Sequence, residues 1–216
     1  MKKRVITIIC FVLIGIVQSN AQVTFQPGVK GGVVFSRLTN FDSDFMTGFY
    51  LGGQLAIKFN KLYTLQPELV YSQQGANSNY SDLLIDNYYN ESIITVNNSV
   101  KHSLDYLCLG AISKFSFGTG FHVIVGPSLD FKVNDNFDKS YFYSDSPIGF
   151  DFAIVGGFGF SFPNGLSLDA RFKQGVVDIY GNNYNTNIDN NNNGNYDEVV
   201  LNQSFQLGLS YSFDIK

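Results

Sequence analysis

The sequence predicts an all-β fold, an eight-stranded antiparallel up-and-down transmembrane β-barrel. Three observations predict it: apolar side chains alternate with small or polar ones, long and short connections alternate along the chain, and charge is scarce. Only 15% of the 216 residues are charged and 16% are aromatic, whereas soluble domains carry about 25% charged residues. The hydrophobic share of 44% is ordinary, which argues against a protein built from membrane-spanning helices.

The first 21 residues have the pattern of a secretory signal peptide. A basic segment at 2–4 precedes an apolar run at 5–17, and Ser19 and Ala21 supply small residues at a cleavage site. The apolar run is shorter than the roughly 20 residues that span a membrane. We therefore expect cleavage after Ala21.

The mature chain is then a single domain of residues 22–216. Because the signal holds only basic charges, 11 basic and 18 acidic residues remain, a formal net charge of −7. This acidic balance excludes a nucleic-acid partner, which would require a basic face. Cys108 is the one cysteine left, so no intramolecular disulfide can form.

The first four predicted strands cover 27–36, 48–59, 62–74 and 103–115. In the third, the polar face reads Thr64, Gln66, Glu68, Ser72 and Gln74, with Val70 interrupting. In the fourth, the apolar run at 107–109 blurs the alternation. Period-two alternation of this kind is typical of strands with two unlike faces.

The last four predicted strands cover 121–132, 150–162, 165–180 and 204–213. The strand at 150–162 has the strongest pattern, with Phe150, Phe152 and Ile154 on one face and Asp151 and Ala153 on the other. The polar face of the strand at 165–180 reads Ser167, Asp169, Arg171 and Lys173.

The predicted connections alternate strictly in length. They are long at 37–47, 75–102, 133–146 and 181–201, and short at 60–61, 116–119 and 163–164. Successive connections of an up-and-down sheet lie at opposite ends, so one end has tight turns and the other has long polar loops. Outer-membrane barrels have short periplasmic turns and longer extracellular loops, which predicts a Gram-negative outer-membrane location.

The large apolar side chains are expected to face lipid. The alternative, a soluble barrel with these groups inside, would overfill an interior that just accommodates side chains in an eight-stranded barrel. Aromatic residues near the strand ends fit the interfacial girdles of such barrels, with Tyr50, Tyr71, Phe131 and Phe205 expected at the long-loop end.

The polar face then lines the lumen with an ionic network. Its expected members are Lys58, Glu68, Lys114, Asp130, Lys132, Asp151, Asp169, Arg171 and Lys173. Because an unpaired buried charge costs several kcal/mol, we expect these groups to pair and plug the lumen. The alternative is a narrow solute or ion channel along the same side chains.

A further candidate site lies in the last long connection. The residues Asp189, Asn191, Asn193 and Asp197 have the spacing of calcium ligands, but Val200 replaces the terminal acid of that pattern. The segment is either a calcium loop or a solvated asparagine-rich loop, and no other cofactor is implied.

We predict no enzymatic activity. A lipid-modifying enzyme would need His with Ser and an acid, and His102 and His122 are the only histidines. His102 adjoins Ser103, but adjacent strand residues point to opposite faces. The loop at 75–102, rich in Tyr and acids, favours a structural or loop-mediated binding role with extracellular or periplasmic protein partners, beside contact with outer-membrane lipid.

The chain resembles the PorT-like porin family of Bacteroidetes, which shares the outer membrane protein beta-barrel domain. The resemblance rests on the segments at 28–36, 65–75, 156–160 and 168–172, of which Leu-Gln-Pro-Glu-Leu-Val-Tyr-Ser-Gln-Gln-Gly is the most specific. The fourth strand departs from the family at Cys108 and Gly110. The resemblance implies an eight-stranded outer-membrane barrel, with a secretion-associated role known for one namesake.

Overall fold

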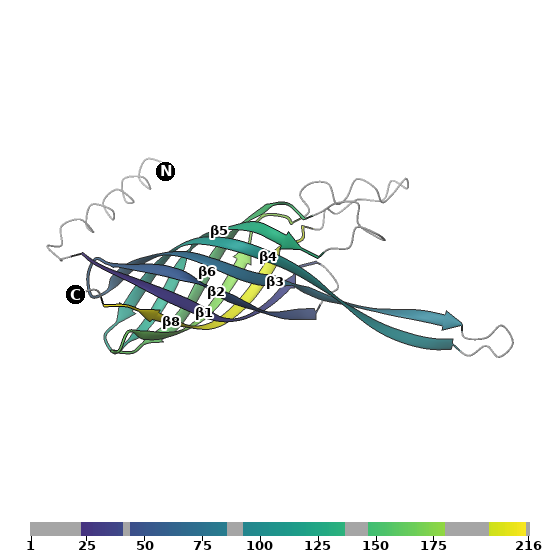
Figure 1. Cartoon of the computed structure of the whole chain (residues 1–216), viewed down its shortest axis with the longest axis horizontal. Helices are drawn as coiled ribbons and strands as arrows, with labels where there is room; N and C mark the ends of the chain where they lie inside the picture. The colour runs from purple at the N-terminus through teal and green to yellow at the C-terminus, as the bar shows by residue number, and fades with distance from the viewer. Residues whose placement is uncertain (1–22, 41–43, 86–92, 137–146, 180–198, 215–216) are drawn as a thin grey trace, which may run out of the picture.

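The computed structural model describes residues 23–40, 44–85, 93–136, 147–179 and 199–214. They form eight strands in one closed barrel (Figure 1). The strands are β1 (Thr24–Leu38), β2 (Asp44–Lys58), β3 (Tyr63–Ile85), β4 (Ile93–Phe117), β5 (Phe121–Asp135), β6 (Phe150–Ser161), β7 (Leu166–Gly175) and β8 (Asn202–Ser212). The predicted fold class is confirmed. The expected signal peptide lies outside the described residues.

Each strand pairs with the next one in the chain, always antiparallel, and β1 pairs with β8 to close the sheet. The closing register runs from Gly28↔Ser212 to Leu38↔Asn202. Closure gives the backbone of every strand two neighbours, which the hydrocarbon core of a bilayer requires because lipid offers no hydrogen bonds. In the described part of the chain, no helix is long and apolar enough to cross a membrane.

Side chains alternate between the two surfaces of the sheet as the sequence predicts. In β5, the burial pattern alternates from Phe121 to Phe131, with large apolar residues outside and His122, Ile124, Ser128 and Asp130 inside. The outer surface of the barrel carries large exposed apolar groups on all eight strands, among them Phe25, Leu51, Leu69, Leu107, Val125, Phe158, Leu168 and Leu209. This surface fits contact with lipid.

Tyr50 is an exception to the expected aromatic girdle. Its side chain is only 3% exposed and lies inside the lumen, with the Lys30 Nζ 5.7 Å from its ring centroid. The prediction of Tyr50 at the lipid interface is wrong, because Tyr50 is in phase with Gln54 on the inward face of β2. Gly208 on β8 leaves room for the ring, since an added Cβ there would meet the tyrosine hydroxyl.

The expected loop at 75–102 is also wrong. The strands β3 and β4 continue in register far past their predicted ends, as far as the pair Ile85↔Ile93. Their barrel neighbours stop pairing earlier, at Asp44↔Asn77 on one side and Leu104↔Asp135 on the other. We call residues 78–85 and 93–100 the β3–β4 arm, which projects from the barrel as a two-stranded ribbon (Figure 1).

The arm lacks the clean alternation of the other strands for a physical reason. Outside the membrane and outside the barrel, a ribbon has no lipid face and no lumen face, so nothing imposes an apolar–polar period. The two backbones pair in register, and the asparagines and serines of this segment give no alternating pattern in the sequence.

The predicted strand at 165–180 ends early, at Gly175. The chain then turns over the barrel mouth, where Val177 N–H donates to Asp151 Oδ1 over 3.3 Å and Ile179 N–H donates to the Val200 carbonyl. Both Ile179 and Val200 are buried in an apolar cluster at the long-loop end of the lumen. The interior is therefore partly apolar, which the sequence did not indicate.

The tight turns at the opposite end are stabilised by asparagine side chains. In the β2–β3 turn, Asn60 Oδ1 accepts hydrogen bonds from the backbone N–H groups of Leu62 and Tyr63 over 2.8 and 2.7 Å. In the β6–β7 turn, Asn164 Oδ1 accepts from Leu166 N–H, and Gly165 has a φ of 88°, a conformation that glycine adopts without strain.

Candidate functional site in the barrel interior

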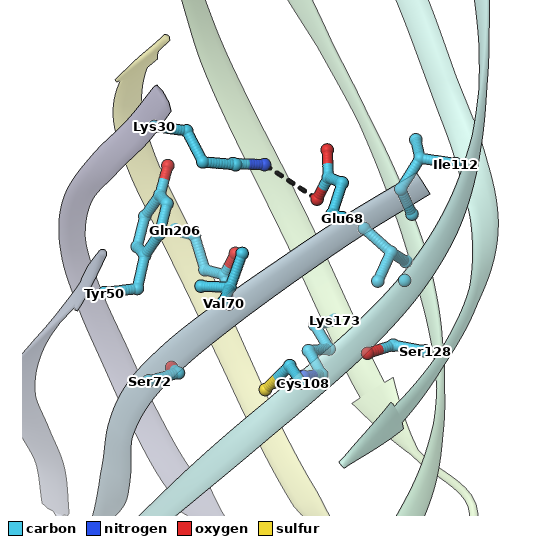
Figure 2. Close-up of a pocket in the computed structure, with 12 residues that line it drawn as sticks. Lys30, Tyr50, Glu68, Val70, Ser72, Cys108, Ile112, Ser128, Lys173 and Gln206 are labelled. Atoms are coloured by element: carbon cyan, nitrogen blue, oxygen red, sulfur yellow. Dashed lines mark hydrogen bonds and ion pairs between the residues drawn. The ribbon is translucent and has the colours of Figure 1, made fainter. Parts of the chain in front are cut away.

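A cluster of three charged side chains crosses the middle of the lumen. Glu68 on β3 accepts from Lys30 on β1, with 2.8 Å between Nζ and Oε2 (Figure 2). The same carboxylate accepts two bonds from Arg171 Nη1 on β7, at 3.1 and 2.8 Å. All three side chains are buried. Because β3 and β7 are not neighbours in the sheet, these bonds join opposite walls of the barrel.

The network continues toward the tight turns. Arg171 Nη2 lies 3.1 Å from Asp169 Oδ2, and His122 Nε2 lies 2.7 Å from Asp169 Oδ1. The other ring nitrogen of His122 is 3.2 Å from Ser161 Oγ. Lys114 Nζ donates to the same hydroxyl over 2.8 Å.

Ser161, His122 and Asp169 thus have the order of a hydrolytic triad, but their surroundings favour a structural role. The Ser161 hydroxyl accepts from Lys114 and, over 2.9 Å, from Ser167. These two bonds occupy both lone pairs of the hydroxyl oxygen, so none is free to attack a substrate. His122 is 0% exposed.

A second ionic group lies toward the long loops. Lys173 on β7 forms an ion pair with Asp130 on β5, and its Nζ is 3.4 Å from Cys108 Sγ. Ser128 donates to Asp130 over 2.6 Å. Asp151 is opposite Asp130 in the β5–β6 register and is also buried.

The structure distributes the nine expected network residues over three environments. Six of them lie buried in the lumen, namely Glu68, Asp130, Asp151, Asp169, Arg171 and Lys173. Lys114 and Lys132 are partly buried, and Lys132 pairs with Asp135 near the long-loop rim. Lys58 is exposed at the tight-turn rim instead of within the network, because it is the last residue of β2.

The expected set lacked three participants, Lys30, His122 and Tyr50. Lys30 and His122 lie on the polar faces of their predicted strands, so the alternation identifies them as inward-facing residues. Their ion-pair partners depend on the register of the closed sheet and could not be predicted. The calcium residues Asp189, Asn191, Asn193 and Asp197 lie outside the described residues. Within the described part, no three His, Cys, Asp or Glu side chains are placed to hold a metal ion.

The middle of the lumen leaves very little space. A cavity of about 30 Å³ lies between Lys30, Glu68, Cys108 and Lys173 (Figure 2). This volume corresponds to about one water molecule. The interior at this level is therefore filled by side chains and hydrogen bonds.

Comparison with known proteins agrees with this architecture. Residues 18–181 match the family described as outer membrane protein beta-barrel domain, and the chain belongs to this family. It is a small outer-membrane β-barrel with a buried ionic interior. No curated protein matches the chain.

Several solved structures are similar. Neisserial surface protein A is 13% identical with a TM-score of 0.48, and the match covers 89% of this chain and 100% of that one. Ail of Yersinia pestis, in complex with the heparin analogue sucrose octasulfate, is 14% identical with a TM-score of 0.45, covering 88% and 99%. A de novo designed transmembrane β-barrel is 10% identical with a TM-score of 0.40, covering 87% and 95%.

Gly159→Ala is expected to destabilise the barrel by about 1–3 kcal/mol, the usual cost of overpacking. An added Cβ would clash with the Leu168 carbonyl oxygen and would lie 2.5 Å from both Asp169 Oδ1 and His122 Nε2, so both the β7 backbone and that side-chain pair would have to shift. Gly156→Ala, on the same strand with nothing within 4 Å of the added atom, is the matched control. Urea unfolding of the refolded variants measures both, and equal stabilities would contradict the packing described here.

Cys108 provides a direct probe of the filled lumen. Its side chain is 6% exposed, and Figure 2 shows it beside Lys173. We expect a charged, membrane-impermeant thiol reagent to leave the folded mature barrel unlabelled and to label it fully after denaturation, as read by mass spectrometry. Rapid labelling of the folded protein would show an open aqueous path to the centre.

Proposed function

We propose that the protein is a non-conducting outer-membrane barrel that binds a protein partner outside the membrane through the β3–β4 arm. The ionic cross-links between opposite walls support a sealed lumen with a structural role. The PorT-like subgroup within the family, and export by a cleaved signal peptide at residues 1–21, are part of the same proposal.

The observation that carries the binding role is the free backbone of the arm. Its two strands pair with each other from Ser78↔Val100 to Ile85↔Ile93, and no other strand in the described part of the chain pairs with them. Eight register pairs at about 3.4 Å per residue extend the ribbon by about 27 Å. Each outer edge presents unpaired N–H and C=O groups, to which an extended segment of a partner can add as a further strand.

The charge of the long-loop end indicates the chemistry of the partner. Acidic residues in and around the long connections occupy positions 42, 44, 82, 86, 91, 135, 138, 145, 178, 189, 197 and 198, whereas basic residues there are Arg37, Lys101, Lys132 and Lys139. Complementarity favours a partner with basic side chains. The sulfated ligand named for Ail is not transferred to this chain, because a polyanion would be repelled here.

Removal of the arm tests the proposal. Asn77 and Lys101 are register partners, so residues 78–100 can be replaced by the two-residue turn Asn-Gly, which suits a tight hairpin. We expect the shortened protein to fold as a heat-modifiable barrel but to lose partner adducts when intact cells are treated with a crosslinker.

The matched control keeps the arm and changes only its strand edges. Proline at alternate positions of residues 79–83 removes backbone donors from the edge while the loop length stays the same. Adducts that disappear in both variants support strand addition. Adducts that persist in the arm-deleted protein would assign binding to another loop and contradict the proposal.

A further inference from the structure

The tight-turn end of the barrel contains a wide vestibule. Its volume is about 740 Å³, within the range of roughly 300–1,000 Å³ of small-molecule sites. Three lysines line it, Lys58, Lys61 and Lys114, together with hydroxyl and amide groups that include Thr64, Ser116, Ser167 and Gln66. No acidic side chain is among the described residues that line it.

Two of the lysines form a defined pair. Thr64 is the register partner of Lys58 on β2 and of Lys114 on β4. The two lysines therefore lie in one row across three strands, about 10 Å apart at their backbones, with the threonine between them. At this separation the long side chains can converge on one ligand, and the two ammonium groups repel each other until an anion lies between them.

The carboxylates nearest to this pair, Asp169 and Glu68, attract Lys114 but are shared with other cations. Asp169 and Glu68 lie deeper in the lumen, where they are engaged by Arg171, His122 and Lys30. Asp214, at the rim, accepts a hydrogen bond from Gln26. Lys58 has no ion pair or side-chain hydrogen bond in the described residues, and Lys114 donates only to Ser161 there.

We propose that this vestibule binds a phosphate-bearing ligand, with Lys58 and Lys114 holding the phosphate and Thr64 donating its hydroxyl between them. Charge-assisted bonds from two ammonium groups suit a phosphate dianion. The cavity is much larger than a bare phosphate, so the ligand carries a substituent, as in a small phosphomonoester or a lipid headgroup. The short-turn end places the vestibule on the periplasmic side.

Calorimetric titration of the refolded barrel in a neutral detergent tests this directly. The probes are glycerol 3-phosphate and dihexanoyl phosphatidic acid below its micelle concentration, at constant ionic strength in chloride. We expect saturable binding of at least one probe, weakened about tenfold or more in Lys58→Gln/Lys114→Gln. Binding of the water-soluble probe identifies a free phosphomonoester site, and binding of the lipid alone identifies a headgroup site.

The control is Lys101→Gln, which removes the same charge from the opposite end of the barrel and should bind like the unmodified protein. Lys58→Gln alone keeps the test valid if the double variant does not fold, because Lys58 is exposed and makes no internal bond. Titrations without saturable heat for either probe, or equal affinities in all variants, would overturn the proposal.

Discussion

Replacing Glu68 by glutamine is expected to lower the free energy of unfolding by about 3–5 kcal/mol, the cost of removing one partner from a buried ion pair. Glu68 accepts from Lys30 and twice from Arg171 in the centre of the lumen. Without the carboxylate, Lys30 loses its ion pair and Arg171 retains only Asp169.

Asp135→Asn is the matched control, since it also converts an acid into its amide. Asp135 pairs with Lys132 over 2.6 Å at the rim, where both side chains are partly exposed. We expect a loss below about 1 kcal/mol, as for surface pairs. Urea unfolding in micelles measures both variants, and a small effect of Glu68→Gln would show that the central cluster does not stabilise the barrel.

Leu51→Arg is expected to cost about 2–4 kcal/mol in a bilayer, the penalty for arginine near the membrane midplane. Leu51 is 63% exposed in the middle of β2, on the outer surface of the sheet. If this surface meets lipid, the guanidinium must enter hydrocarbon or deform the membrane. If this surface met water, the same substitution would hardly change the free energy of unfolding.

Leu62→Arg distinguishes the effect of depth in the membrane from the effect of side-chain exposure. Leu62 is 51% exposed but lies in the tight turn between β2 and β3, so we expect a cost of only about 0–1 kcal/mol, as near the interface. Unfolding of both variants from lipid vesicles gives the comparison. Equal costs at the two positions would contradict a membrane-spanning orientation of the strands.

The barrel could be predicted from the sequence because a membrane barrel imposes a strong alternation of apolar and polar side chains on each strand. The strands at 121–132, 150–162 and 204–213 separate large apolar from small or polar side chains, since one face meets lipid and the other a narrow lumen. The alternation also identified Glu68, Asp169 and Arg171 as interior groups. These features are local, so they can be inferred without the tertiary structure.

The features that could not be predicted from the sequence depend on the register of the closed sheet and on the room available inside the lumen. Glu68 and Arg171 are 103 positions apart, and only the closed sheet brings them together. Tyr50 lies inside because Gly208, far along the chain, leaves room for its ring. The β3–β4 arm is outside both lipid and lumen, so no periodic pattern distinguished it from a loop.

Planar lipid bilayer recordings of the refolded mature protein test the central claim most directly. Because ionic cross-links and an apolar cluster fill the lumen, we expect no stable conductance steps above the background of the bilayer, at either polarity and at high salt. Reproducible steps of uniform size from the purified barrel would contradict a sealed interior and identify a channel.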